Sequence, residues 1–205
     1  MSTLTQAQAT TILRHLGWRI RTTDEYVAVV KRFQRGWNLG PALKVDGHVG
    51  PDTSAALLLS ESRRRAGKKT ASAHFSFSEV ACHCDGTYSS CPRIWQKRSA
   101  FRMMESYRSK SGRPLDVISA CRCPSRNAAV GGSPTSRHLT GRACDVEAVF
   151  SVATVKSWGV ARTSATGPPA SRSSTSTTAL AQPSTLRPST PTEADQRTRE
   201  RAGRD

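Results

Sequence analysis

The sequence predicts an α+β protein with a small three-helix module first, then a mixed domain with an antiparallel sheet, and a disordered tail. Three composition regimes indicate this division. Residues 1–60 carry apolar side chains at helical spacing, and residues 75–160 mix short apolar strands, a helix and glycine-rich loops. Residues 161–205 are rich in Ser, Thr, Pro, Arg and Ala and lack aromatic side chains, which predicts disorder. Residues 61–74 are basic and small, as expected of a linker.

The charge balance limits the classes of partner. The 205 residues include 31 Lys and Arg against 15 Asp and Glu, a formal net charge of +16. Residues 161–205 hold seven Arg and four acidic residues, or +3, so +13 lies on residues 1–160. Such charge favours an anionic partner. Nucleic-acid binding would rest on charge alone, because the sequence has no helix-turn-helix, zinc-finger or aromatic RNA-binding motif.

Membrane insertion and secretion by a signal peptide are not predicted. No apolar run approaches the ~18–20 residues that a membrane-spanning helix needs. The first residues lack a charged segment followed by an apolar one, so no secretory signal is visible. We therefore expect synthesis in the cytoplasm, where the six cysteines stay reduced.

The first two helices are predicted from their caps and apolar spacing. Thr5 or Thr10 is a candidate cap for a helix that carries Leu13, and Asp24 is a candidate cap for a helix that carries Phe33. A turn rich in glycine follows, and Pro51 is suited to the first position of a third helix.

This first region resembles the three-helix type of peptidoglycan-binding domain. That domain has a Phe-Gln pair followed by a Leu-x-Val-Asp-Gly-x-x-Gly-x-x-Thr turn, and the matching residues here are Phe33, Gln34, Leu43, Val45, Asp46, Gly47, Gly50 and Thr53. The resemblance implies binding to bacterial peptidoglycan. The alternative is a helical module without wall affinity, because Asp and Thr are also ordinary turn and cap residues.

The chemistry-bearing segment of the second region ends in a histidine and an aspartate. An apolar strand at 115–118 is followed by a long loop that contains His138, and Asp145 lies in the next apolar segment, 144–150. A neutral imidazole and a carboxylate suit Zn²⁺. The two are seven positions apart, so only the fold of the loop can bring them together.

The whole segment is similar to the zinc D-Ala-D-Ala carboxypeptidase family, in the form found in many phage endolysins. The matching residues are Ser119, Arg122, Cys123, Pro124, Asn127, Val130, Gly131, Gly132, Ser136, His138, Gly141, Ala143 and Asp145. The sequence departs at Ala120 and Cys121, where the family has Gly and Tyr.

The resemblance implies a role for several of these residues. His138 and Asp145 would bind zinc, and Arg122 would orient the substrate as a catalytic and substrate-binding residue. Ser136 would lie at the substrate and, with Asn127, shape the loop. The implied reaction is metal-assisted hydrolysis of a D-alanine-containing bond in the peptidoglycan stem peptide or cross-link. An endolysin without a signal would reach the wall through a membrane pore, and anionic wall polymers would be further partners.

The third zinc ligand of the family is missing from the sequence. It comes from a late Gly-Phe-Val-His-Val-Asp strand, but no histidine follows His138, and His74 and His83 match no ligand position. Codons for residues 172–177 can be chosen so that a shift of two bases reads Phe-Val-His-Val-Asp. We therefore hypothesise that the tail from about residue 160 is read out of frame, a natural disordered tail being the alternative. Two functions follow as candidates: an active hydrolase, and a wall-binding protein with a dead catalytic domain.

The cysteines offer a second, weaker metal signal. Cys82, Cys84 and Cys91, with Cys123 as a further candidate, could form a structural zinc site, although Cys-x-Cys is tighter than the usual spacing. Disulfides formed after release from the cytoplasm and a set of merely buried thiols are the alternatives.

Overall fold

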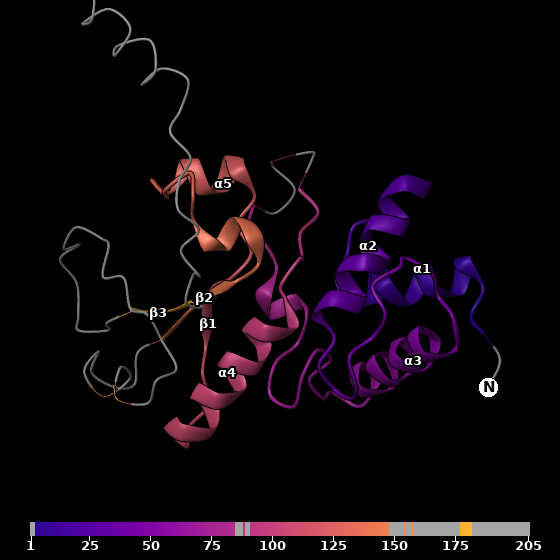
Figure 1. Ribbon diagram of the computed structural model, residues 1–205, viewed down its shortest axis with the longest axis horizontal. Helices are drawn as coiled ribbons and strands as arrows, with labels where there is room; N and C mark the ends of the chain where they lie inside the picture. The colour runs from indigo at the N-terminus through magenta and orange to yellow at the C-terminus, as the bar shows by residue number, and fades with distance from the viewer. Residues whose placement is uncertain are drawn as a thin grey trace, which may run out of the picture.

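The computed structural model describes residues 3–84, 88, 91–147, 154, 157 and 177–181 (Figure 1). Helices and a small antiparallel sheet make up the described residues, which confirms the α+β class. The elements in chain order are α1 Gln6–His15, α2 Thr23–Gly36, α3 Pro51–Arg65, η1 Ser78–Val80, α4 Arg98–Ser111, β1 Val117–Ser119, α5 Pro124–Ala129, η2 Arg137–Thr140, β2 Ala143–Glu147 and β3 Thr177–Ala181. None of the helices in the described residues is both long and apolar enough to cross a membrane.

Helices α1 to α3 form the predicted three-helix module. Thr5 caps α1 as expected, in a capping box with Gln8. The cap of α2 is Thr22 rather than Asp24, because the Thr22 backbone is extended and its side chain accepts a hydrogen bond from the Glu25 N–H. Asp24 lies in the first turn instead, where its charge favours the positive end of the helix.

The segment expected to be a linker, 61–74, is packed against the rest of the protein. Helix α3 continues to Arg65, and Ala71 and Ser72 are fully buried. The Ala71 carbonyl accepts a hydrogen bond from the Asn38 N–H (2.8 Å), and the Ser60 hydroxyl donates to the Thr70 carbonyl (3.0 Å). Despite its basic composition, this segment is therefore part of the folded structure and is not a flexible linker.

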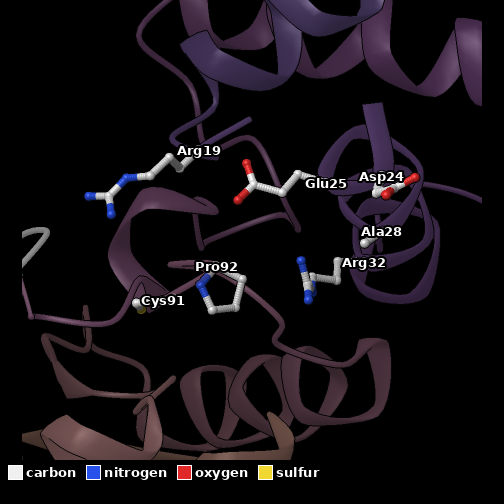
Figure 2. Close-up of a pocket in the computed structure, with 7 residues that line it drawn as sticks. All are labelled: Arg19, Asp24, Glu25, Ala28, Arg32, Cys91 and Pro92. Carbon is white, nitrogen blue, oxygen red and sulfur yellow. The ribbon is translucent and has the colours of Figure 1, made fainter. Parts of the chain in front are cut away.

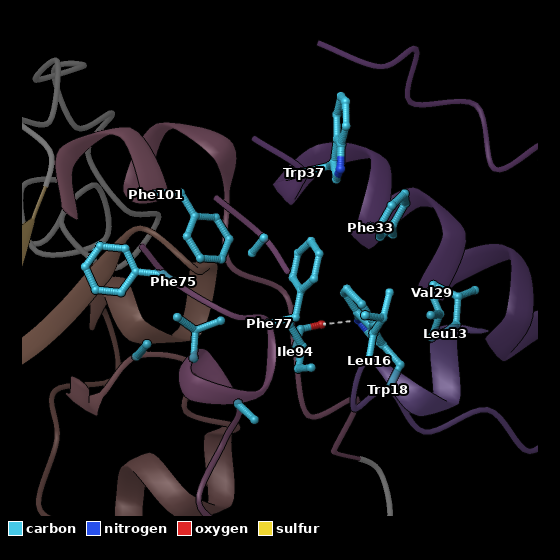
Figure 3. Close-up of a cluster of buried hydrophobic side chains, with 14 of the residues drawn as sticks. Leu13, Leu16, Trp18, Val29, Phe33, Trp37, Phe75, Phe77, Ile94 and Phe101 are labelled. Carbon is cyan, nitrogen blue, oxygen red and sulfur yellow. Dashed lines mark hydrogen bonds between the residues drawn. The ribbon is translucent and has the colours of Figure 1, made fainter. Parts of the chain in front are cut away.

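The two halves of the chain share one hydrophobic core. Phe77 lies between side chains of the N-terminal module and of α4 (Figure 3). Its ring centroid is 4.5 Å from that of Trp18, 5.5 Å from that of Phe33 and 5.8 Å from that of Phe101. The Trp18 indole N–H also donates to the Ile94 carbonyl (3.2 Å). Aromatic contacts of this kind add to the burial of apolar surface, so the module and the second half form a continuous body.

The second half places the functional segment on a three-stranded antiparallel sheet. The strand order is β1-β2-β3, with β2 in the centre, and α4 packs against it. Ser119 of β1 is opposite Asp145 of β2, and Ala179 of β3 is opposite Asp145 on the other side. Asp145 therefore lies on the most constrained strand of the sheet.

The prediction of a wholly disordered tail is wrong for five residues. Thr177–Ala181 form β3, which pairs with β2 along its whole length, from Glu147 opposite Thr177 to Ala143 opposite Ala181. Threonines favour extended backbone, so the polar composition that suggested disorder is also compatible with an edge strand. The other residues of 161–205, including 172–176 of the frame hypothesis, lie outside the described residues.

Candidate active site

His138 and Asp145 come together, although they are seven positions apart in the sequence. His138 lies on η2 and Asp145 on β2, and the His138 Nε2 atom is 3.3 Å from the Asp145 Oδ1 atom. Both residues are buried. Gly141 makes this possible, because it takes a left-handed backbone (φ 65°) between the two elements.

The backbone around His138 fixes its imidazole. The Nδ1 atom lies 2.6 Å from the Ala120 carbonyl oxygen, which can only accept a hydrogen bond. Nδ1 therefore carries a proton, and Nε2 is the ring nitrogen that faces Asp145. The His138 carbonyl in turn accepts hydrogen bonds from the Trp95 indole N–H (3.2 Å) and the Arg122 N–H (3.3 Å). The sequence missed both Trp95 and the Ala120 carbonyl. A main-chain carbonyl leaves no side-chain signal, and Trp95 lies outside the motif that carries the resemblance.

Arg122 holds the other oxygen of the aspartate. Its Nη2 donates a short hydrogen bond to Asp145 Oδ2, and its Nε donates to the Ser119 hydroxyl (2.8 Å). Oδ1 is thereby left on the side of His138. The sequence suggested that Arg122 would orient the substrate; the structure places its guanidinium on a neighbouring carboxylate, where it positions Asp145.

The pair has the donor types and the separation that a zinc site needs. Two ligand atoms at about 2.0–2.1 Å from a tetrahedral zinc ion are about 3.3 Å apart, which matches the separation of His138 Nε2 and Asp145 Oδ1. The Nδ1 hydrogen bond to a carbonyl is the outer contact that zinc-binding histidines usually have. His138 and Asp145 therefore have the donor types and the separation that the zinc-ligand role implied by the resemblance requires.

A third ligand does not join the pair within the described part of the chain. The only group of three or more His, Cys, Asp or Glu ligand atoms found there is a cysteine cluster elsewhere. His74 pairs instead with Glu105, with Nδ1 2.6 Å from the carboxylate, and His83 is exposed.

The remaining motif residues build the loop around the pair. The buried Asn127 donates from its amide to the Ser133 carbonyl (2.9 Å), and a Cβ atom on Gly132 would lie 2.3 Å from Asn127 Oδ1. Asn127 thus shapes the loop as expected. Ser136 is the residue before η2 and is partly exposed; it makes no side-chain capping bond, and its N–H donates to the Ser133 carbonyl (2.9 Å).

Gln34 organises the turn of the N-terminal module. It is buried, and its amide nitrogen lies within 2.9 Å of Asp46 Oδ1 and of the His48 carbonyl, and 3.2 Å from the Thr53 hydroxyl. Its carbonyl accepts a hydrogen bond from the Gly47 N–H (2.9 Å). These residues therefore have structural roles, which are compatible with either function of the module.

Two further residues complete the description of that turn. The hydrogen bond from the His48 N–H, followed by the one from Gln34, lowers the pKa of Asp46 to about 2. Gly47 has a left-handed backbone (φ 86°), and a Cβ atom there would meet Val27 at 2.8 Å. Gly50, by contrast, has an ordinary φ of −76° and open space around it, so its backbone does not require glycine.

Two pockets lie beside α2, and neither is lined by His138 or Asp145. The first has two arginines and the two carboxylates of Asp24 and Glu25, and only the second is basic. The first, of about 270 Å³, lies between α2 and the segment that carries Cys91 and Pro92; Arg19, Arg32 and Glu25 also line it (Figure 2). The second, of about 380 Å³, is lined by Arg32, Arg35, Pro92, Trp95, Lys97, Cys123, Pro124, Leu139 and Thr140. It lies on the N-terminal-module side of the loop that holds His138.

Comparison with known proteins agrees with this arrangement. A protein-family model described as Peptidase M15 matches residues 73–175, which is half of the chain and includes His138, Asp145 and Arg122. No curated protein matched the chain. M15 peptidases are zinc-dependent metallopeptidases, and the family implies action on peptidoglycan. The fold, the buried histidine–aspartate pair and this match lead to one conclusion: the chain belongs to the Peptidase M15 family.

Proposed function

We propose that this protein is a peptidoglycan hydrolase of the endolysin type that cleaves a D-alanine-containing bond in the stem peptide or cross-link. One observation carries the proposal. His138 Nε2 and Asp145 Oδ1 face each other at 3.3 Å, each fixed from behind by a separate hydrogen bond, within the segment that matches the peptidase family. This arrangement suits a metal-binding pair, because an imidazole nitrogen and a carboxylate oxygen at this distance can both coordinate one cation.

The residues of the chain have distinct tasks in this proposal. Zinc, when bound, supplies a Lewis acid and a bound water whose pKa falls toward ~7. His138 and Asp145 bind the ion, and the Ala120 carbonyl keeps the His138 proton on Nδ1. Arg122 fixes Asp145 through Oδ2, and its remaining N–H groups are the proposed contact to a substrate carboxylate or carbonyl. Ser136, partly exposed two residues before His138, is the proposed second substrate contact.

The N-terminal module is proposed to hold the enzyme on the wall. The match of its turn to the peptidoglycan-binding pattern supports this, and the +13 charge on residues 1–160 favours anionic wall polymers as additional partners. Synthesis in the cytoplasm of a phage-infected host, followed by release through a membrane pore, is the route that fits such an enzyme.

A second candidate function has its own support. Within the described residues only two zinc ligands converge, and two ligands hold zinc weakly compared with the three of a catalytic site. The chain would then be a wall-binding protein with an incomplete peptidase site.

Digestion of purified peptidoglycan separates the two candidates. The full chain is incubated with sacculi and zinc, and soluble products are identified by mass spectrometry, which distinguishes released D-alanine from opened cross-links. We expect His138→Ala to lower product release by at least about 100-fold, because a metal ligand is lost. His74→Ala is the matched control, since His74 pairs with Glu105 away from the site. Sacculi that retain the full chain but yield no products would favour the wall-binding candidate.

The frame hypothesis has a direct test in the gene. Sequencing across codons 155–180 is expected to reveal a histidine codon in one of the two alternative frames. The absence of a histidine codon from both frames rejects the hypothesis and leaves a tail encoded as written.

A further inference from the structure

Four cysteine side chains from three separate segments converge outside the histidine–aspartate site. The Sγ atoms of Cys82, Cys84, Cys91 and Cys123 all lie within 4.8 Å of one another. All four residues are buried, and none of them is in a disulfide. Cys82 and Cys84 follow η1, and Cys123 is the residue before α5. Cys123 is 39 positions from Cys84 and 41 from Cys82 in the sequence. The tertiary fold therefore brings these side chains together, and the local geometry of one helix could not.

Backbone N–H groups point at three of the four sulfur atoms. The Cys123 N–H donates to Cys82 Sγ (3.3 Å), the Arg93 N–H to Cys91 Sγ (3.4 Å) and the Arg126 N–H to Cys123 Sγ (3.4 Å). Such donors stabilise a negatively charged sulfur. A sulfur that accepts backbone hydrogen bonds in this way is suited to be a thiolate metal ligand.

The backbone next to Cys91 is strained in a way that serves this contact. Arg93 has a φ of 65°, and it is the one residue other than glycine with a positive φ in the described parts of the chain. A left-handed backbone is unfavourable for arginine and persists only where the surroundings enforce it. Here the unusual turn at Pro92 aims the Arg93 N–H at Cys91 Sγ.

Burial of the cluster opposes thiolates as long as no cation is bound. Burial raises the pKa of Cys82 and of Cys91, because removal from water disfavours the thiolate; the neighbouring cysteines add to the effect. A divalent ion reverses this balance, since a coordinating thiol loses its proton. Arg32 lines the same pocket as Cys91, so its guanidinium would partly balance the charge of a tetrathiolate centre.

We propose that Cys82, Cys84, Cys91 and Cys123 hold a structural zinc ion as four thiolates, separate from the ion at His138 and Asp145. Closed sites with four cysteine ligands are a common structural form of zinc. Cys121 packs against the cluster but is excluded from the ligand set. Its sulfur accepts a hydrogen bond from the Trp95 N–H (3.2 Å) and donates to Gln96 Oε1 (3.6 Å).

The ion would stabilise the position of the segment that carries Arg122 in the peptidase site. Cys123 directly follows Arg122, whose side chain positions Asp145, and Cys82 follows the short helix whose Val80 carbonyl accepts from the Cys121 N–H (3.1 Å). Closing the four ligands on one ion therefore fixes both ends of the segment that carries Arg122. The four-cysteine site thus has a structural role and takes no part in the reaction.

The test removes the active-site metal and asks whether a thiolate-bound metal remains. A His138→Ala/Asp145→Asn double variant is purified under reducing conditions, and its zinc is counted by mass spectrometry. We expect about one zinc per chain, and replacement by Co²⁺ is expected to give the intense near-ultraviolet sulfur-to-cobalt bands of thiolate coordination. Adding Cys91→Ser is expected to abolish both signals. Adding Cys121→Ser instead, the matched control, is expected to leave both intact.

Measurements on the unaltered chain keep the proposal testable if Cys91→Ser fails to fold. Zinc is expected to protect four thiols from alkylation, and a strong chelator is expected to expose them. A double variant that contains no metal and whose thiols all react with the alkylating agent would overturn the proposal. An intact mass lower by two hydrogens per cysteine pair would also overturn it, because it would show disulfides instead of free thiols. These readouts do not depend on hydrolysis, so the cysteine site can fail or succeed independently of the proposed activity.

Discussion

Individual side chains in this protein often hold several partners at once, and Glu61 is an example. Its carboxylate is buried on α3 and accepts from the guanidinium groups of Arg64 and Arg65, while His15 lies 3.2 Å away on α1. These contacts, with the Arg64 hydrogen bond as the largest, lower the pKa of Glu61 to about 2 from an ordinary value of 4.5. Because Arg64 and Arg65 also lie on α3, the charged form mainly stabilises the last turns of that helix, and His15 extends the contact to α1.

Glu61→Gln is expected to make the stability of the protein less sensitive to acid. A carboxyl group whose pKa is lower in the folded state contributes fully above about pH 4.5, and the contribution disappears as the pH falls through about 2. At pH 7 we expect the free energy of unfolding of the variant to be about 1–2 kcal/mol lower than that of the unaltered protein. Urea unfolding from pH 7 to pH 2 measures the difference between the two proteins, which should shrink below pH 4.5. Asp24→Asn, on the exposed first turn of α2, is the control. An unchanged gap at pH 2 would contradict the assignment.

At this scale the sequence predicts which side chains come together better than it predicts the groups that hold them in place. His138, Asp145 and Gln34 are side chains in a spaced pattern, so the resemblance identified them. The Ala120 carbonyl could not be found in that way, since any residue at that position offers a carbonyl. The contact between Arg122 and Asp145 depends on the register of β1 and β2, which spacing does not determine.

At the scale of elements, the connection from η2 to β2 decides whether the site forms. Gly141 ends η2 with a left-handed backbone, and its carbonyl accepts a hydrogen bond from the Lys97 N–H (2.9 Å). A Cβ atom at Gly141 would lie 2.2 Å from the Trp95 carbonyl oxygen. The position therefore excludes larger residues for two reasons, backbone conformation and space.

Gly141→Ala is expected to destabilise the protein by more than its backbone conformation alone explains. Gly112 provides the matched control, because it has nearly the same φ (64°) but open space around it. Gly112→Ala should cost about 1 kcal/mol, and Gly141→Ala should cost about 2–4 kcal/mol because the Trp95 backbone must also move. Thermal unfolding of both variants measures the difference. Equal losses would show that the close contact with Trp95 is unimportant.

Elements with strong local signals were predictable, and those that depend on a partner were not. The apolar spacing identified α1 and α2, Thr5 caps α1 and Pro51 begins α3 as expected, whereas the cap of α2 is Thr22 and not Asp24. Strand β3 was missed, because an edge strand of threonine and alanine has no alternating apolar pattern. Its structure comes from pairing with β2, a long-range contact that composition does not report.

At the scale of the whole molecule, the aromatic contacts around Phe77 join the two halves into one folding unit. Trp18 and Phe33 belong to the N-terminal module, and Phe101 belongs to α4. Arg98 adds a polar link, because its guanidinium donates to the Trp37 and Gly40 carbonyls, both at 2.7 Å. The sequence divided the chain by composition, which could not reveal this shared core.

Phe77→Ala is expected to lower the stability of both halves and to make their unfolding less cooperative. Removing a buried phenylalanine typically costs about 3–5 kcal/mol. We expect the unaltered protein to unfold in one calorimetric transition and the variant to show faster amide exchange in α2 as well as in α4. Phe75→Ala, another fully buried phenylalanine, is the control and should keep one transition. Exchange that rises in α4 alone would contradict a shared core.

The packed 61–74 segment also bears on protein engineering. Wall-degrading enzymes invite recombination by cutting a chain between its modules and fusing a foreign targeting part. In this chain such a cut would leave Trp18 and Phe77 exposed on opposite fragments, together with the unpaired guanidinium of Arg98. Chimaeras joined within residues 61–74 should precipitate unless these exposed apolar surfaces are redesigned. Fusions ahead of α1 leave the shared hydrophobic core unchanged.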